Sequence, residues 1–322
     1  MPDNILAINP EQTTETICNW IRSTVLGALH RRGTVIGLSG GIDSSVCAAL
    51  CARALGPQKV LGLFMPERDS SSDALRLGRL VADSLGISAE LEAIGPALEA
   101  AGCYQRQAEA IREVFPDYGD GYKCKVTMPS VVDSDRLNFV HLVVQSPAGE
   151  IRKSRMPAGA YLKLIAATNF KQRLRKTMEY YHADRLAYAV VGTPNLLEYD
   201  QGFFVKQGDG AADIKPIAHL YKTQVYALAK YLQIPEEVQR QAPTTDTFSM
   251  PQTQEEFYFA LPYDKMDICL YGKNHSTTAG ELAPSIDLTA EQVERVYRDI
   301  DAKRRVAKYL HMAPVTLDTS GL

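Results

Sequence analysis

A short segment rich in glycine and serine, Gly37-Leu-Ser-Gly-Gly-Ile-Asp-Ser44, has the residue types that bind a phosphate group. Gly40 and Gly41 let the backbone turn tightly and bring amide N–H groups close to an anion. Ser39 and Ser44 add hydroxyl donors, and a helix beginning after the turn would add its unpaired N–H groups and its dipole. The segment therefore predicts a phosphate-binding loop.

Asp43 within the same loop indicates a cation as well. A carboxylate repels phosphate unless a metal ion lies between them, and Mg²⁺ prefers such oxygen ligands. The loop matches neither Gly-x-x-x-x-Gly-Lys-Ser/Thr nor Gly-x-Gly-x-x-Gly. The alternative is an ordinary tight turn in which Asp43 caps a helix, and the residues alone leave both interpretations open.

Strands and helices alternate along the chain around this loop. Apolar runs at 34–38, 59–65 and 88–94 predict buried strands. Helices are expected at 13–32, 42–55, 71–85, 158–182, 222–232, 263–271 and 289–309. This alternation predicts an α/β fold with a doubly wound, mainly parallel sheet and helices on both faces. Ligands bind beyond the carboxyl ends of such strands, so the residues after 38 and after 65 should face one crevice.

The alternation is interrupted at 116–157, where runs at 123–127, 137–144 and 151–153 predict antiparallel β-ribbons. This stretch is too short to bury a core of its own, so we expect a small β-ribbon insertion in a single domain covering 1–322. A further strand is expected at 185–191. Residues 200–215 are rich in glycine and charge, and predict a flexible loop.

The composition restricts the class of protein. The chain has 322 residues, a formal net charge of -3 and a pI of about 6.1, so no excess of positive charge favours a nucleic-acid partner. No apolar run approaches the roughly 18 residues of a membrane span, and the first residues do not form a secretory signal. The six cysteines are scattered without a Cys-x-x-Cys pair, which favours buried thiols and a cytoplasmic location.

The loop at 39–45, Ser-Gly-Gly-Ile-Asp-Ser-Ser, resembles the pyrophosphate loop of the N-type ATP pyrophosphatases, which cleave ATP between the α and β phosphates. The second half of the chain resembles the NAD synthetases of that superfamily. The similar segments are Asn169–Arg173, Val191–Glu198, Gly202–Pro216, Leu220–Val225 and Pro243–Asp246. The resemblance covers roughly residues 13–310 and implies an adenine nucleotide alpha hydrolase-like fold.

This resemblance implies a reaction. Deamido-NAD (nicotinic acid adenine dinucleotide) would be adenylated on its carboxylate by ATP, and ammonia would displace AMP to give NAD. It further implies Mg²⁺ held by Asp43 and Glu198, and catalytic roles for Asp43, Lys206 and Asp209. The implied ATP-binding residues are Gly37, Leu38, Ser39, Gly40, Gly41, Ile42, Asp43, Ser44, Arg68, Thr193, Lys222 and Thr244. The implied dinucleotide-binding residues are Asn169, Arg173, Tyr180, Lys206, Asp213 and Lys303.

Simpler interpretations of single residues stay open from sequence. Without the resemblance, Glu198, Lys222 and Arg68 would be read as solvated surface charges, and Tyr180 as a packing residue. A lysine at a helix start is unfavourable without an anion, which favours a functional Lys222.

Whole-protein alternatives are also open. The same chemistry could act on another carboxylate, such as nicotinic acid mononucleotide or a specialised metabolite, or the chain could bind nucleotides without catalysis. We expect ammonia to come from solution or from a separate glutaminase subunit, because no glutaminase domain precedes the synthetase segment. The family resemblance further implies a homodimer.

Overall fold

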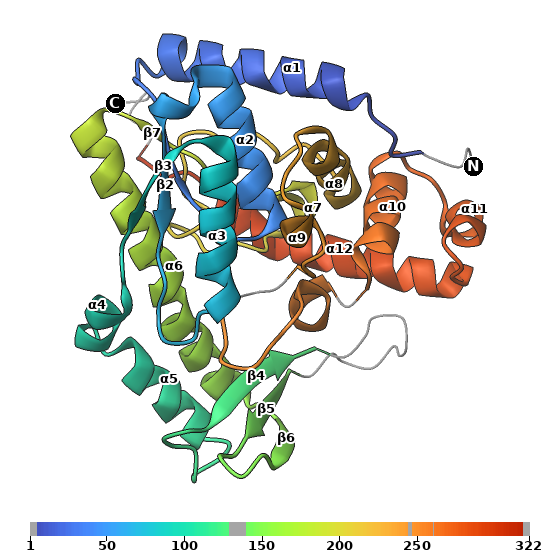
Figure 1. The fold of residues 1–322 in the computed structure, drawn as a ribbon. Coiled ribbons are helices and arrows are strands. Elements are labelled where there is room, and N and C mark those ends of the chain that lie inside the picture. The colour runs from blue at the N-terminus through green and yellow to red at the C-terminus, as the bar shows by residue number, and fades with distance from the viewer. Residues whose placement is uncertain (1–4, 129–139, 244–246, 260, 318–322) are drawn as a thin grey trace.

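A computed structural model describes residues 5–128, 140–243, 247–259 and 261–317. Its centre is a four-stranded sheet with the strand order β3–β2–β1–β7 (Figure 1). All neighbouring strands are parallel. The strands are β1 (Thr34–Gly37), β2 (Val60–Phe64), β3 (Ser88–Leu91) and β7 (Ala189–Val190). The predicted parallel α/β fold is confirmed.

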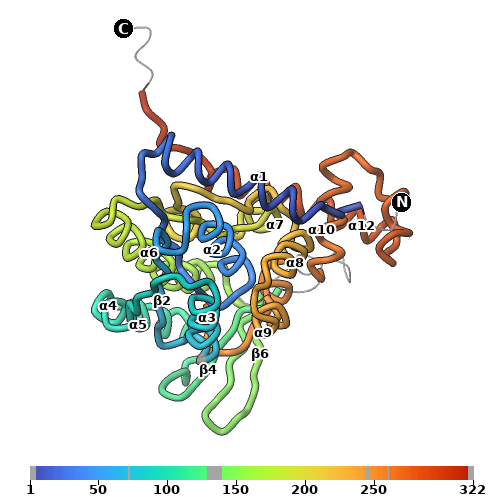
Figure 2. The backbone as a smooth tube through the Cα atoms, turned by 45° about the horizontal axis from the view of Figure 1, so that its top comes forward, coloured from blue at the N-terminus to red at the C-terminus, as the bar shows by residue number. Residues whose placement is uncertain are grey.

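Side chains of these strands alternate between two helical layers. Ile36 and Phe64 pack on one face in a cluster with α2 (Ile42–Leu55) and α3 (Ser72–Leu85). Val35 and Leu63 pack on the other face, against α6 (Ala158–Leu186). Because successive residues of a strand point to opposite faces, a continuous apolar run produces this sandwich. Helices therefore cover both faces, as predicted (Figure 2).

The strand order places a ligand crevice beside β1. Strand β1 pairs with β2 on one side and with β7 on the other, so the connections run outward in opposite directions from this point. In parallel sheets ligands bind where the strand order reverses in this way. The loop after β1 and the segment after β7 both begin at this edge, and Val191 bridges to Ile214 beyond the glycine-rich loop.

A second, antiparallel sheet consists of β4 (Lys123–Thr127), β5 (His141–Gln145) and β6 (Ile151–Arg155). Ribbon structure was predicted in this region, and the structure shows a three-stranded sheet, drawn at the bottom of Figure 1. Its buried face, including Val126 and Leu142, packs against α5 (Cys103–Arg112), α6 and Phe248. The small sheet thus shares its core with the rest of the molecule.

Several predicted bounds were wrong. The helix expected at 13–32 is α1 (Pro10–Arg22) followed by a π-helical turn, η1 (Ser23–Ala28). Asn9 caps α1, and Pro10 supplies a first residue whose missing N–H costs nothing there. The strand expected at 185–191 is only Ala189–Val190, because α6 continues to Leu186 before the left-handed Ala187 ends it.

Helices α10 and α11 lie at the right of Figure 1, and α4 and α5 at its lower left. Two helices that sequence patterns did not predict, α4 (Gly95–Ala100) and α5, follow β3. Apolar side chains of α7, α10 and α12 form a second core. The other helices are α7 (Leu196–Gln201), α8 (Lys222–Tyr231), α9 (Glu236–Gln239), α10 (Tyr263–Asn274), α11 (Ala279–Leu282) and α12 (Ala290–His311). Short turns are η2 (Pro57–Lys59), η3 (Glu255–Phe259) and η4 (Ala283–Ser285).

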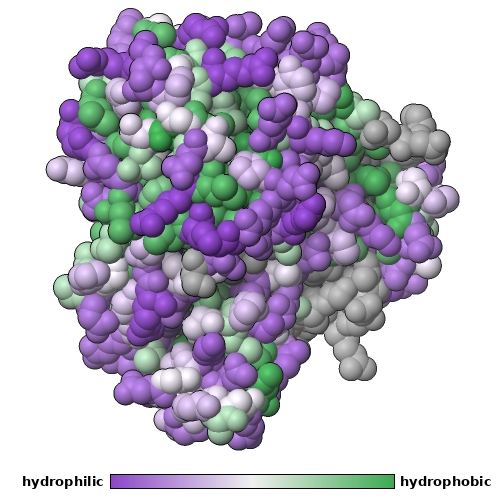
Figure 3. All heavy atoms as spheres, in the orientation of Figure 1, coloured by the Kyte–Doolittle hydropathy of each residue, from purple (hydrophilic) through white to green (hydrophobic). Residues whose placement is uncertain are grey.

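Within the described ranges, no helix has both the length and the apolar character to cross a bilayer. On the face shown in Figure 3, hydrophobic residues form small groups among hydrophilic ones.

Candidate active site

The turn between β1 and α2 has the geometry of an anion site. Gly40 adopts a φ of +78°, and a Cβ there would lie 2.8 Å from the Ala74 carbonyl oxygen, so the position requires glycine. Helix α2 begins after Gly41, and no side chain of the described residues caps it. Its first N–H groups can therefore bind an anion. Ser39 Oγ lies 3.2 Å from Ser44 Oγ in the same turn.

Asp43 does not cap this helix; it contacts residues from the second half of the chain. Its Oδ2 forms an ion pair with the almost fully buried Nζ of Lys222, and its Oδ1 accepts a hydrogen bond from Asn195 Nδ2 at 3.1 Å. Burial opposes the charge on Lys222, but the Asp43 and Glu198 carboxylates outweigh it and raise the pKa of Lys222 above its ordinary value. A cationic lysine is thus fixed beside the turn between β1 and α2.

Asp267 of α10 explains how a lysine can begin a helix. Its carboxylate accepts hydrogen bonds from the backbone N–H groups of Lys222 at 3.1 Å and Thr223 at 2.7 Å. A positive side chain at a helix N-terminus is unfavourable, and the buried Asp267 supplies compensating negative charge. Burial raises the pKa of Asp267 to about 6.

Glu198 is buried near Asp43 at the start of α7. Its Oε2 accepts the N–H of Asn195 at 3.2 Å, while Asn195 Oδ1 accepts the N–H of Glu198 at 3.2 Å, which is a capping box. Glu198 Oε1 accepts a hydrogen bond from Gln254 Nε2 at 2.8 Å. Burial, and secondly the charge of Asp43, raise the pKa of Glu198 to about 7.

These two carboxylates fit a divalent cation. Asn195 contacts both Asp43 and Glu198, so they belong to one cluster, and Lys222 is the cation that pairs with Asp43 there. Burial and the neighbouring Asp43 carboxylate both disfavour the charge on Glu198, and a cation bound between the two carboxylates would favour it. Hard carboxylate oxygens beside a phosphate loop are the donors that Mg²⁺ prefers.

A large cavity of about 1400 Å³ opens over this cluster. It extends from the phosphate loop to α6 and to the glycine-rich loop after α7. The structure brings together on its wall most of the residues that the sequence resemblance singled out. These are Gly37, Leu38, Ser39, Gly40, Gly41, Ile42, Asp43, Ser44, Arg68, Asn169, Arg173, Thr193, Glu198, Lys206, Asp209 and Lys222.

The glycine-rich loop is packed against α6 and held together by Asp209. Asp209 Oδ1 accepts the N–H of Val205 at 2.7 Å, and burial raises the pKa of Asp209. A Cβ at Gly210 would lie 2.3 Å from the Phe204 ring, so glycine is required for this close approach. Lys206 Nζ donates to the carbonyl of Tyr309 at 3.0 Å, at the end of α12.

A family model described as NAD synthase matches residues 13–115 and 137–307. The chain belongs to the NAD synthase family. It is 62% identical to the NH(3)-dependent NAD(+) synthetase of Mesorhizobium japonicum, over 97% of this chain and 98% of that one. It is 34% identical to the protein of the same name from Thermotoga maritima, over 94% and 99%.

Solved structures share the fold. The NMN synthetase from Francisella tularensis superposes with a TM-score of 0.67 at 23% identity, covering 97% of this chain and 100% of that one. The NH3-dependent NAD synthetase from Campylobacter jejuni superposes with a TM-score of 0.61 at 22% identity, with the same coverage. At these identities the likeness establishes the NAD synthase fold.

Some residues that the NAD synthetase resemblance selected do not line this cavity. Tyr180 Oη donates to Asp213 Oδ1 at 3.4 Å, and Asp213 Oδ2 accepts the N–H of Val190 at 2.7 Å. Lys303 pairs with Asp299 at 2.6 Å on its own helix, and burial lowers its pKa. Thr244 lies outside the described residues.

The structure also adds residues that sequence reasoning missed. Lys176 and Glu179 form a buried ion pair of 2.6 Å in the cavity wall, behind Gly37. A lysine and a glutamate three residues apart on a helix are expected to form an ion pair. However, nothing in the sequence indicates that this face of α6 is buried beneath the loop that begins at Gly37. Asn195 had a signal, because Asn-x-x-Glu is the pattern of a capping box. Gln254 had none.

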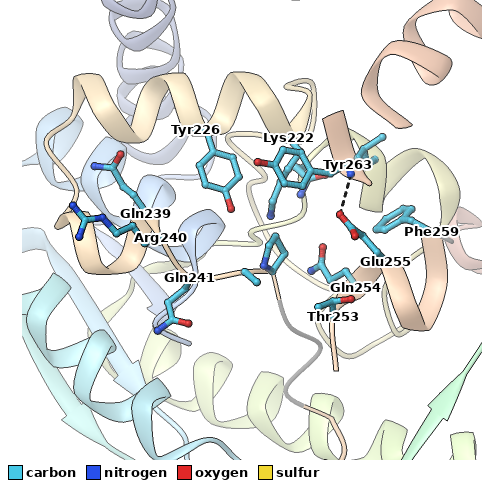
Figure 4. A pocket seen from close by; sticks show the side chains of 14 residues that line it. Lys222, Tyr226, Gln239, Arg240, Gln241, Thr253, Gln254, Glu255, Phe259 and Tyr263 are labelled. Atoms are coloured by element: carbon cyan, nitrogen blue, oxygen red, sulfur yellow. Dashed lines mark hydrogen bonds between the residues drawn. The ribbon is translucent and has the colours of Figure 1, made fainter. Parts of the chain in front are cut away.

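A smaller pocket of about 240 Å³ adjoins the large cavity (Figure 4). Helix α8 contributes Lys222 and Tyr226, and the Tyr226 ring stacks on that of Tyr263 with a centroid distance of 5.4 Å. Lys222 and Gln254 line both spaces, so they form part of the wall between them.

Proposed function

We propose that this chain catalyses the ATP-dependent amidation of deamido-NAD to NAD with ammonia, releasing AMP and pyrophosphate. The observation that carries the proposal is the cluster of Asp43, Lys222 and Glu198 at the N-terminus of α2, in the wall of the cavity that also contains Asn169 and Lys206. The family supplies the reaction class, since its members named above are ammonia-dependent NAD synthetases.

In the first step a carboxylate oxygen of deamido-NAD attacks the α-phosphorus of ATP, and the bond to pyrophosphate breaks. The free N–H groups of α2 and the ammonium group of Lys222 stabilise the negative charge that pyrophosphate carries away. Mg²⁺ held by Asp43 and Glu198 would supply charge neutralisation at the phosphates. This step needs no side-chain nucleophile, because positioning and electrostatics suffice for phosphoryl chemistry.

In the second step ammonia attacks the acyl carbon of the adenylate, AMP leaves with one former carboxylate oxygen, and ammonia loses a proton. Asn169 and Arg173 lie one helical turn apart on α6, where they can hold the dinucleotide. The loop that contains Lys206 and Asp209 forms the adjacent cavity wall, where it excludes water from the reactive adenylate. Tyr180, Asp213, Thr244 and Lys303 remain proposed contacts of the substrates.

The dinucleotide is favoured over nicotinic acid mononucleotide by sequence identity. Three relatives at 62%, 59% and 55% identity are named as ammonia-dependent NAD(+) synthetases. The NMN synthetase shares the fold at 23% identity, which carries no argument about substrate. The ion-paired Lys222 and Asp43 argue against a nucleotide-binding protein that has lost catalysis.

Three further features belong to the proposal. Ammonia comes from solution or from a separate glutaminase subunit. The chain matches relatives named as ammonia-dependent synthetases over nearly their full lengths, which supports this source. The chain forms a homodimer through exposed apolar side chains of α1 and α6, among them Trp20, Leu162 and Tyr181. Six free, buried thiols suit the reducing cytoplasm.

Product analysis tests this function. The chain is mixed with Mg-ATP, ammonium chloride and deamido-NAD, and pyrophosphate and NAD are quantified. We expect the two products in equal amounts, and a kcat/KM at least about tenfold lower with nicotinic acid mononucleotide. Glutamine in place of ammonium should give no NAD. Two results would refute the proposal: pyrophosphate release with nicotinic acid mononucleotide but none with deamido-NAD, or pyrophosphate release in the absence of any acid.

A further inference from the structure

Strand β4 of the small sheet is attached to a segment far along the chain, residues 249–256. Ser249 Oγ accepts the N–H of Cys124 at 2.9 Å, and Met250 N donates to the Cys124 carbonyl at 3.0 Å. Two residues on, Gln252 Nε2 donates to the Val126 carbonyl. The segment thus runs beside β4 and is fixed by hydrogen bonds to its backbone.

An ion pair closes this attachment. Lys125 Nζ lies 2.6 Å from Glu256 Oε1, with side-chain exposures of 19% and 35%. Met128 N also donates to the Glu256 carbonyl at 3.2 Å. Neither Lys125 nor Glu256 lines the large cavity or the smaller pocket. Neither side chain therefore reaches a substrate directly in these two spaces.

The opposite side of the same segment reaches the site. Gln254 N donates to the Pro243 carbonyl at 3.0 Å, and Gln254 Nε2 donates to Glu198 Oε1 at 2.8 Å. Gln254 lines both cavities. Figure 4 shows Gln254 between Thr253 and Glu255, with Lys222 across the pocket. A hydrogen bond of this kind fixes which way a carboxylate points, and so how well it can bind a cation.

We propose that β4 is a positioning element for the triphosphate end of the site, with Lys125 and Glu256 as positioning residues that set Gln254 against Glu198. This inference rests on the proposed function in taking Glu198 as a ligand of the magnesium–ATP complex. Strand β4 lies in residues 116–136, between the two stretches that the family model matches. The strand is therefore not part of the stretches by which the family model recognises the chain.

A charge swap tests the link. Lys125→Glu and Glu256→Lys should each raise the KM for Mg-ATP about three- to tenfold, because each places like charges together and displaces the segment. The KM for deamido-NAD should stay within about twofold. The double variant, with the pair reversed, should recover to within about twofold of the parent. Lys153→Glu on β6 is the matched control, since Lys153 is exposed on the same sheet, and should change neither KM.

Binding measurements make the result independent of turnover. In calorimetric titration with Mg²⁺ and α,β-methylene-ATP, both single variants should bind the nucleotide more weakly than the parent, and the double variant should bind it about as tightly as the parent. This order should hold whichever acid the protein amidates. If the parent makes no NAD but the swap still restores nucleotide binding, the proposed function fails and the positioning role stands. Unchanged affinity in both single variants, or a double variant as weak as either, would overturn the inference. Should a reversed charge prevent folding, Lys125→Gln replaces it, with a smaller loss expected and unchanged affinity again contradicting the role.

Discussion

Lys222 and Asp43 form an ion pair, largely hidden from solvent, although 179 positions separate them in the sequence. Asp43 belongs to the phosphate loop after β1, and Lys222 begins α8. Because Asp267 holds the first turn of α8 and Asn195 holds Asp43, both partners are fixed before any nucleotide binds. The pair joins the two halves of the chain at the place where ATP is proposed to break.

Replacing this lysine should abolish most of the activity. Lys222→Met leaves Asp43 and Glu198 without their cation and removes a positive charge from the departing pyrophosphate. We expect pyrophosphate release to fall at least about 100-fold. Lys230→Met, at an exposed position of the same helix, is the control and should retain the parent rate. A Lys222→Met protein that folds and keeps more than a tenth of the activity would contradict the assignment.

The raised pKa of Glu198 predicts a pH dependence of ATP use. The carboxylate must be ionised to bind magnesium, and its ionised fraction rises as pH increases through about 7. The kcat/KM for Mg-ATP should therefore fall about tenfold per pH unit below this value and level off above it, since kcat/KM reports groups of the free enzyme. In Glu198→Gln the residual activity should not follow this profile. An unchanged profile in the variant would show that another group titrates.

The raised pKa of Glu198 also makes the stability of the fold depend on pH, in the direction opposite to that of ATP use. The folded protein holds the Glu198 proton more tightly than the unfolded chain, whose pKa is near the ordinary 4.5. The free energy of unfolding must then decrease as pH rises from about 4.5 to about 7 and stay reduced above that. Glu198→Gln removes this loss, so urea melts at pH 8 should show a stability gain of about 1–2 kcal/mol over the parent. At pH 4.5 the gain should disappear; an equal gain at both pH values would rule out a titration effect.

Asp267 should matter to both stability and nucleotide binding. Asp267→Ala leaves the N–H groups of Lys222 and Thr223 without their acceptor, which costs about 1–3 kcal/mol at a buried helix start. Because α8 begins with the proposed phosphate ligand, the KM for Mg-ATP should rise as well. Thermal melts and steady-state kinetics measure both. Asp264→Ala provides the comparison, because Asp264 lies on α10 like Asp267, and it should lower the free energy of unfolding by less. Equal losses of stability in the two variants would argue against a specific capping role of Asp267.

Much of the fold could be predicted because local patterns dictated it. The apolar runs at 34–38 and 59–65 indicated buried parallel strands, and the glycines after the first run indicated the turn in which Gly40 has a positive φ. Bounds were missed where tertiary contacts overrode local signals, as where α6 continues to Leu186 because packing on the sheet extends it. The antiparallel strands β4, β5 and β6 were anticipated from the loss of the helix–strand alternation.

Some residues of the candidate site could also be predicted from the sequence, and others could not. Asp43 was marked by its place in the glycine-rich loop after β1, whereas Glu198 was marked only by the resemblance to the NAD synthetases. Gln254 was not marked, because it reaches Glu198 from the residue just before the short turn η3, in a segment hydrogen-bonded to β4. A glutamine in such a segment has no periodicity to mark it, so only the folded structure reveals its contact.

The most direct test of the account follows the oxygen atoms of the acid. Deamido-NAD labelled with ¹⁸O at both carboxylate oxygens is converted with ammonium and Mg-ATP, and AMP and NAD are analysed by mass spectrometry. Adenylation of the carboxylate predicts one labelled oxygen in AMP and one retained in the amide of NAD. AMP without label, or label in pyrophosphate, would contradict the account.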